Sequence, residues 1–187
     1  MTGGAGELVL RDTRADERPA IRELTLRAYA EYATTMAPTA WAGLEQSLLT
    51  ALGTEGAAEC IVAERQGQLV GSVLLYPPAA DAYGGAAQRA SWPEVRLLAV
   101  APDARGQGVG RALMEECVRR ARRMGAAELG LHTSMSMRAA MQMYERMGFV
   151  RVPELDFHPD GAEVVEAYRL RLSDPAAPQR DRPEIRE

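Results

Sequence analysis

The sequence predicts a mixed α/β fold in which helices flank one mixed β-sheet, in the order β-α-α-β-β-β-α-β-α-β-β. Short, strand-like apolar runs alternate with longer segments whose apolar residues recur every three or four positions. A glycine-rich loop joins a central strand directly to the helix with the clearest apolar stripe. The length of 187 residues suits one domain. We place it at 7–172, between a flexible start at 1–6 and a Pro-rich tail at 173–187 that we expect to be disordered.

The first half of the chain is expected to supply a strand, two helices and a hairpin. The first helix should begin near Asp16, because Pro19 then falls in its first turn, where the missing N–H costs little. The dipeptide Gln66-Gly67 is typical of a tight hairpin. The elements expected here are strand 7–11, the helix from Asp16, helix 37–52, and strands 58–65 and 68–76.

The second half alternates strands and helices after a loop at 77–91, which is defined by its composition. The helix after the glycine-rich loop has apolar residues at i, i+3 and i+4 spacing from Val109 to Met124. The following helix is stopped by Gly148. The elements expected here are strand 92–100, helix 108–125, strand 127–133, helix 135–148, and strands 149–152 and 163–172.

The composition argues against several classes of function. A formal net charge of -4 argues against a nucleic-acid partner. The N-terminus lacks the pattern of a signal peptide, and no run approaches the ~18 apolar residues of a membrane span, so we expect a cytoplasmic protein without a membrane partner. His132 and His158 stand alone, so no metal site is expected. Cys60 and Cys117 are expected to be free thiols.

Three glycines, Gly106, Gly108 and Gly110, stand where a strand passes into a helix. A helix N-terminus presents unpaired N–H groups, and residues without a Cβ let an anion approach them closely. A phosphate or pyrophosphate is therefore the natural ligand. No Lys follows, and the spacing does not fit the dinucleotide fingerprint, which excludes two common phosphate loops. The alternative is that the glycines only permit a tight turn and close helix packing.

Two blocks of sequence resemble the GNAT superfamily of N-acetyltransferases. Arg105-x-x-Gly108-x-Gly110, after the strand-like LLAVAPDA, is similar to the R/Q-x-x-G-x-G/A signature of that family. AAMQMYERMGF, at 139–149, is similar to its A-x-x-(L/M)-Y-E-x-x-G-F segment. One helix and one strand separate the two blocks, as in the family. The resemblance implies the acyl-CoA N-acyltransferase fold with a central splayed sheet, and acetyl-CoA as the acetyl donor.

The resemblance also implies where acetyl-CoA would bind. Its pyrophosphate would sit on the N–H groups of 106–111, and its pantetheine arm would pair with a bulged strand, 94–100, where that strand splays from 127–133. Many family members have Asn seven residues before the helix tyrosine, whereas this chain has Met137, whose thioether cannot replace the amide's hydrogen bonds. The residues expected at the cofactor are Leu98, Ala99, Val100, Arg105, Gly106, Gln107, Gly108, Val109, Gly110, Arg111, Thr133 and Tyr144.

Acetyl transfer to an amine needs a base for the amine, a polarised carbonyl and a proton for the leaving thiolate. The resemblance implies Tyr144 as the acid, and the Leu98 N–H is the candidate for the carbonyl. Glu94 is the candidate base, because some family members carry a catalytic glutamate at the matching position. A solvated strand end and a water chain are the alternatives for this role, and His132 is a further candidate base.

The acceptor is expected to be shaped by residues 29–41, 77–91 and 153–162. Aromatic residues gather in or beside the first two segments, and with Glu31 and Glu94 they would suit a small cationic amine. Packing against the sheet is the alternative for these rings, which are Tyr29, Tyr32, Trp41, Tyr83 and Trp92.

We therefore predict an enzyme that transfers acetyl directly, in a ternary complex, to the primary amine of a small molecule. The prediction leaves a homodimer open. The alternatives are acetylation of a protein N-terminus or lysine, and a non-catalytic acyl-CoA sensor. A co-crystal with CoA and a screen of amines would separate them.

Overall fold

The structure is a computed structural model that describes residues 6–172 except 55, 57, 86, 88, 89 and 160–162. The tail predicted at 173–187 and residues 1–5 of the predicted flexible start lie outside the described residues. The strands are β1 Leu8–Asp12, β2 Glu59–Arg65, β3 Gln68–Tyr76, β4 Glu94–Val100, β5 Glu128–Ser134, β6 Val150–Arg151 and β7 Val165–Arg171. The helices are α1 Arg18–Tyr29, α2 Pro38–Gly53, α3 Val109–Arg123 and α4 Arg138–Arg146.

The strands form one mixed seven-stranded sheet in the order β1-β2-β3-β4-β5-β7-β6. Neighbouring strands are antiparallel except β4 and β5, which are parallel. The predicted hairpin is confirmed: Gln66 and Gly67 take φ values of 51° and 76° between β2 and β3. The predicted α/β fold with a mixed sheet is confirmed as well. The helix expected from 135 begins with a short 3-10 turn at Met135–Met137.

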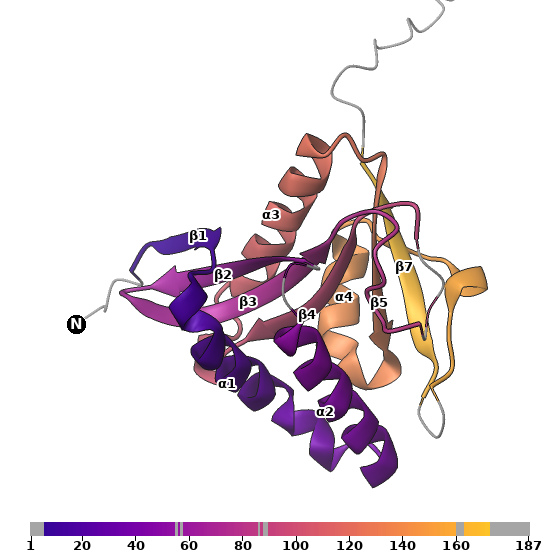
Figure 1. The fold of residues 1–187 in the computed structure, drawn as a ribbon, viewed down its shortest axis with the longest axis horizontal. Helices are drawn as coiled ribbons and strands as arrows, with labels where there is room; N and C mark the ends of the chain where they lie inside the picture. The colour runs from indigo at the N-terminus through magenta and orange to yellow at the C-terminus, as the bar shows by residue number, and fades with distance from the viewer. Residues whose placement is uncertain are drawn as a thin grey trace, which may run out of the picture.

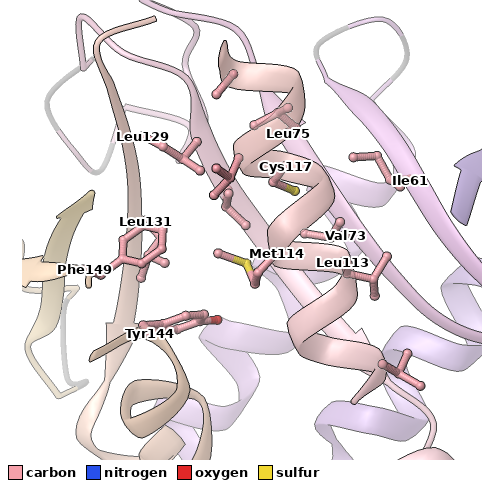
Figure 2. Close-up of a cluster of buried hydrophobic side chains, with 14 of the residues drawn as sticks. Ile61, Val73, Leu75, Leu113, Met114, Cys117, Leu129, Leu131, Tyr144 and Phe149 are labelled. Atoms are coloured by element: carbon pink, nitrogen blue, oxygen red, sulfur yellow. The ribbon is translucent and has the colours of Figure 1, made fainter. Parts of the chain in front are cut away.

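The helices cover both faces of the sheet (Figure 1). One face carries α1 and α2, whose Leu24 and Leu48 pack with Leu74 of β3. The other carries α3 and α4, whose buried residues form the larger core cluster (Figure 2). Leu113 and Cys117 of the predicted apolar stripe are completely buried there. Gly71 lets α3 come this close to β3, since a Cβ at that position would stand 2.9 Å from Val109 Cγ1.

The centre of the sheet is irregular where the site forms. β4 pairs with β5 only at Glu94–Gly130 and Val95–Leu131, and the two strands then separate. On its other edge, β4 has an extra residue against β3 between Arg96 and Ala99. Leu97 lies within this bulge and has a φ of 54°, a left-handed conformation that is rare for a side chain of its size. The bulge and the splay expected between 94–100 and 127–133 are thus both present.

Candidate active site

A groove opens where β4 leaves β5, at the N-terminus of α3. Gly108 is the N-cap of α3 with a φ of 80°, and Gly106 has a φ of 71°. Both need the left-handed conformation that glycine adopts without cost, and a Cβ at either position would have no atom within 4 Å. Neither glycine is therefore required for close packing within the protein. Both glycines line the groove, so the space beside them is available to a ligand.

The groove has a volume of about 580 Å³. Its walls come from the end of α1, β4, the glycine-rich loop and α4. All but two of the residues expected at a cofactor line it: Leu98, Ala99, Val100, Arg105, Gly106, Gly108, Val109, Gly110, Arg111 and Tyr144. Gln107 is one exception, and its side chain hydrogen-bonds to the Asp103 carbonyl (2.9 Å) and to Arg65. Thr133 is the other, and it lines the neighbouring cavity instead.

Arginine side chains line the open end of the groove. Arg105 ties its loop to the end of α1, through Glu31 Oε2 at 2.7 Å and the Ala28 carbonyl at 2.7 Å. Arg111 pairs with Glu115 at 2.8 Å, but both side chains are largely exposed. Arg146, in the last turn of α4, lines the groove without an ion pair among the described residues. These cations and the N-terminus of α3 together favour an anionic ligand.

Tyr144 lies on the inner wall of the groove. Its side chain is buried, and its hydroxyl is directed toward α3 near Met114 (Figure 2). Burial raises the pKa of this hydroxyl well above its usual value, and the neighbouring Tyr29 and Tyr32 add to the shift. The phenol therefore keeps its proton at neutral pH and can only donate it.

A second cavity, of about 330 Å³, lies beside the groove. Residues from all three segments expected to shape an acceptor site line it, including Met36, Tyr83 and Phe157. Two further residues, Tyr29 and Met137, line both the groove and the cavity and so mark where the two meet. Trp41, on α2, packs against the core on that face of the sheet, Trp92 lies over Gly130, and Tyr32 lines the groove. The cavity is thus partly aromatic, as expected, but only Tyr29 and Tyr83 of the five expected rings line it.

Glu94 is buried and is joined to a buried histidine. His132 Nδ1 contacts Glu94 Oε1, and His132 Nε2 lies 3.1 Å from the Leu155 carbonyl oxygen. A carbonyl oxygen only accepts hydrogen bonds, so Nε2 carries a proton. One more proton must lie between Nδ1 and Glu94, on either atom. The pair is therefore neutral overall, either as carboxylate and imidazolium or as carboxylic acid and imidazole.

Glu94 does not line the cavity, whereas His132 and Tyr83 do. The Tyr83 ring packs edge-on against the His132 ring, with 4.8 Å between centroids. Burial raises the pKa of the Tyr83 hydroxyl well above its usual value, and the nearby Glu94 carboxylate adds to the shift. The side chains of His132 and Tyr83 thus separate Glu94 from the cavity.

The charge of the cavity differs from the sequence expectation. Of the two carboxylates expected at a cationic amine, Glu31 is paired with Arg105 and Glu94 with His132, and neither lines the cavity. Its described lining contains instead the half-buried Arg96, and the exposed Glu163. Arg96 was missed because a lone arginine in a strand carries no motif, and only the fold brings it to this place.

Other chemistries find little support in the described residues. Both cysteines are free. Burial raises the pKa of the Cys60 thiol to about 11 and that of Cys117 to about 12, so neither is a ready nucleophile. No group of three or more His, Cys, Asp or Glu in the described part of the chain could hold a metal ion. None of the described helices is both long enough and apolar enough to cross a membrane.

Comparison with known proteins gives consistent matches. Residues 18–149 match the profile of the Acetyltransferase (GNAT) family. A mycothiol acetyltransferase from Nocardia farcinica is 33% identical over 180 residues, which cover 87% of this chain and 52% of that protein. This chain therefore spans about half the length of that relative.

Solved structures share the fold. One from Corynebacterium glutamicum, described as histone acetyltransferase HPA2 and related acetyltransferase, has a TM-score of 0.67 at 22% identity and covers 91% of this chain and 99% of its own. A GNAT family acetyltransferase from Elizabethkingia anophelis, solved with acetyl-CoA bound, has a TM-score of 0.59 at 17% identity over 88% of this chain and 98% of its own. At these identities the likeness establishes the fold alone.

Proposed function

The chain belongs to the GNAT family of acetyltransferases, and from that premise we propose that it transfers acetyl from acetyl-CoA to the amine of a small molecule held in the cavity. The observation that carries this proposal is the junction at Tyr29 and Met137, where a groove suited to a phosphorylated donor meets a separate cavity. Two reactants entering from the two sides would meet there, as direct transfer in a ternary complex requires.

The groove supports acetyl-CoA as the donor. The N–H groups of 106–111 and the end of α3 would hold its pyrophosphate, with Arg111 and Arg146 beside them. Beyond Val95, β4 has no strand partner on the β5 side among the described residues, so its backbone is free to pair with the pantetheine arm. Met137 stands where relatives often have Asn, and it supplies contact area but no amide hydrogen bonds.

Two groups that line the groove would assist the transfer step, one at the acetyl carbonyl and one at the sulfur. The Leu98 N–H, on the bulge, would polarise the acetyl carbonyl as it becomes tetrahedral. Tyr144 would give its proton to the CoA sulfur as the carbon–sulfur bond breaks.

The amine proton would pass to the pair formed by Glu94 and His132. Glu94 does not line the cavity, and both nitrogens of His132 are engaged, one with Glu94 and one with the Leu155 carbonyl. The Tyr83 hydroxyl would therefore take the amine proton as it gives its own proton to the Glu94 carboxylate, and His132 would position that carboxylate. Glu94→Gln cannot take up the proton, so kcat/KM for the amine should fall by roughly 10²-fold while acetyl-CoA affinity is unchanged. An unchanged kcat/KM would exclude Glu94 from proton transfer.

The size of the cavity favours a small acceptor. Its volume of about 330 Å³ is near the lower end for small-molecule sites, roughly 300–1,000 Å³. A protein N-terminus or a lysine side chain would instead be expected to approach along an extended groove. Cytoplasmic location, the absence of nucleic-acid and membrane partners, and a homodimer stay predictions of the sequence.

Two measurements on the intact chain test the proposed function. Acetyl-CoA should raise thermal stability, by about 2.7 kcal/mol at a hundred times its dissociation constant. Free thiol should then be released from acetyl-CoA when amines are added, with peptides of varied N-terminus as the comparison set. No thermal shift at millimolar acetyl-CoA would contradict the donor. A clear shift without thiol release from any amine would indicate the acyl-CoA sensor.

A further inference from the structure

We propose that the acceptor carries a carboxylate as well as its amine, and that Arg96 binds this carboxylate inside the cavity. The inference rests on the proposed function and adds the class of acceptor. It starts from the disagreement between the expected and the observed charge of the cavity. A site for a simple cationic amine would place a carboxylate on its inner wall, whereas the half-buried charge found there is an arginine and the one carboxylate in the described lining, that of Glu163, is exposed.

The Arg96 guanidinium is held in place by three contacts from two segments, α2 and the loop that contains Ala82 and Tyr83. One terminal nitrogen donates to the Ala82 carbonyl and the other to Ser47 Oγ of α2. The guanidinium also lies over the Tyr83 ring, 4.7 Å from its centroid. A guanidinium has five N–H donors, so these two bonds leave others for a ligand. Its orientation is fixed in advance, and little rotamer freedom would be lost on binding.

The charge of Arg96 is not balanced by the protein residues described. No carboxylate among them lies within ion-pair distance of its guanidinium. Glu94 belongs to a pair with His132 that is neutral in either arrangement of its proton. Glu163, which lines the cavity, is exposed and accepts a hydrogen bond from Ser136 at 2.8 Å. The positive charge of Arg96 therefore has no compensating negative charge, whether the shared proton lies on Glu94 or on His132. An anionic group on the ligand would neutralise it, and a buried charge is costly without such a partner.

Three buried hydroxyls of the described cavity lining have no hydrogen-bond partner, and besides that of Tyr83, which lies near Glu94, they belong to Thr133 and Ser134. Thr133 and Ser134 are 4% and 5% exposed, both line the cavity, and neither hydroxyl oxygen has a hydrogen-bond partner in the structure. Two hydroxyls and a guanidinium are all donors suited to carboxylate oxygens. A phosphate would bring a second negative charge that no other described arginine lining the cavity can meet. Much of the remaining lining is apolar or aromatic, which suits an amino acid with an apolar body.

Matched pairs of amines test the proposal. The probes are phenylalanine, leucine and γ-aminobutyrate, each beside its amide, with acetyl transfer measured as free thiol released. The wild type should prefer the acids by about 10²-fold in kcat/KM, because the amide has no charge to pair with Arg96 and offers one acceptor oxygen where the carboxylate offers two. Amidation makes a neighbouring amine less basic, so intrinsic reactivity favours the amides and cannot create this preference.

Variants assign the preference to Arg96. Arg96→Gln should bring the ratio of acid to amide close to one. Arg169→Gln is the control, because Arg169 also lies over an aromatic ring, that of Trp92 at 5.5 Å, but does not line the cavity. It should keep the wild-type ratio. Should Arg96→Gln not fold, Arg96→Lys takes its place, and it should lower the ratio while keeping the charge.

A binding measurement covers the case in which none of these amines is acetylated. With acetyl-CoA present, 3-phenylpropanoate should raise the melting temperature of the wild type and not that of Arg96→Gln, whereas 3-phenylpropanamide should raise neither. Equal use of acids and amides, or equal shifts by the two phenyl compounds, would overturn the carboxylate site and leave acetyl transfer intact. Failure of acetyl-CoA itself to bind would instead overturn the proposed function.

Discussion

The groove and the cavity are built in different ways, although they meet at Tyr29 and Met137. The groove depends mainly on backbone: left-handed glycines, a bulge at Leu97, and two strands that separate after Val95. The cavity depends on side chains from α2, the loop at 77–91, β4, β5 and the segment before β7. A short local motif is enough to specify a site made of backbone. A site made of side chains from distant segments can be altered by a single substitution in any of them.

This difference suggests a division of labour within one enzyme. In the proposed reaction the donor is the same in every turnover, so a fixed backbone surface would suit it. The acceptor would be recognised by what individual side chains offer, and here these are Arg96, three unpartnered hydroxyls and several aromatic rings. Substitutions in the groove should therefore impair reaction with every acceptor, and substitutions in the cavity should change which acceptor is used.

The largest effect should come from Tyr144, on the groove side of the junction. As a hypothesis, its hydroxyl protonates the departing sulfur, and Tyr144→Phe removes only that oxygen. Turnover should fall by ~10²–10⁴-fold with every acceptor, while KM for acetyl-CoA moves much less, because the interaction belongs to the transition state. Single-turnover rates separate chemistry from product release. Equal rates for the variant and the wild type would remove Tyr144 from the mechanism.

The groove could be predicted from the sequence because its determinants are local. The glycine spacing, the following helix and the block around Tyr144 fall within residues 94–149, and the family they indicated is confirmed. Strand 68–76 was predicted with the observed bounds, and the bounds of the other strands were predicted to within two residues. The splay and the bulge were predicted only from the resemblance to the family. The residue types of the segment LLAV do not predict the positive φ of Leu97.

The cavity could be predicted only as a set of segments. Glu31 and Glu94 were expected to face the acceptor, but each is paired with a residue far away in sequence, Arg105 and His132. A charge pattern along the chain does not say which partner the fold brings within reach. For the same reason Arg96 was not recognised, and Thr133 was assigned to the donor although it lines the cavity.

A smaller effect should come from the glycine at the start of α3, and it tests whether the groove is a backbone site. Gly108→Val puts a side chain where an approaching phosphate needs space, so acetyl-CoA affinity should fall at least tenfold. Gly125→Val is a matched control: Gly125 has a φ of 72°, a Cβ added there would have no atom within 4 Å, and the residue does not line the groove. Both variants should lose about 1–2 kcal/mol of stability from left-handed strain. Equal affinities by calorimetry would show that the glycines serve only the turn.

The smallest effect should arise at Asp156, in the segment that holds one wall of the cavity. Its carboxylate binds the Arg151 guanidinium at 2.5 and 2.6 Å and accepts the Ala167 N–H at 3.0 Å. It stands between Leu155, whose carbonyl fixes His132, and Phe157, whose ring packs 5.2 Å from that of His132. Asp156→Asn should therefore cost roughly 1 kcal/mol at neutral pH, the scale of a net hydrogen bond. It should reduce kcat/KM for the acceptor a few-fold and leave acetyl-CoA affinity unchanged.

The pH dependence of this loss follows from the pairing with Arg151, which lowers the pKa of the Asp156 carboxyl below its ordinary value. A carboxyl whose pKa is lowered by folding contributes stability that is complete above its unfolded pKa of about 3.9 and disappears as pH falls through the lower folded value. The melting temperatures of Asp156→Asn and the wild type should differ at neutral pH and converge in acid, because a protonated Asp156 is as neutral as Asn. A difference that persists unchanged below pH ~2 would mean that the charge does not hold this wall. A rise in the acetyl-CoA dissociation constant would mean that the groove depends on the cavity wall, contrary to the separation between the two sites.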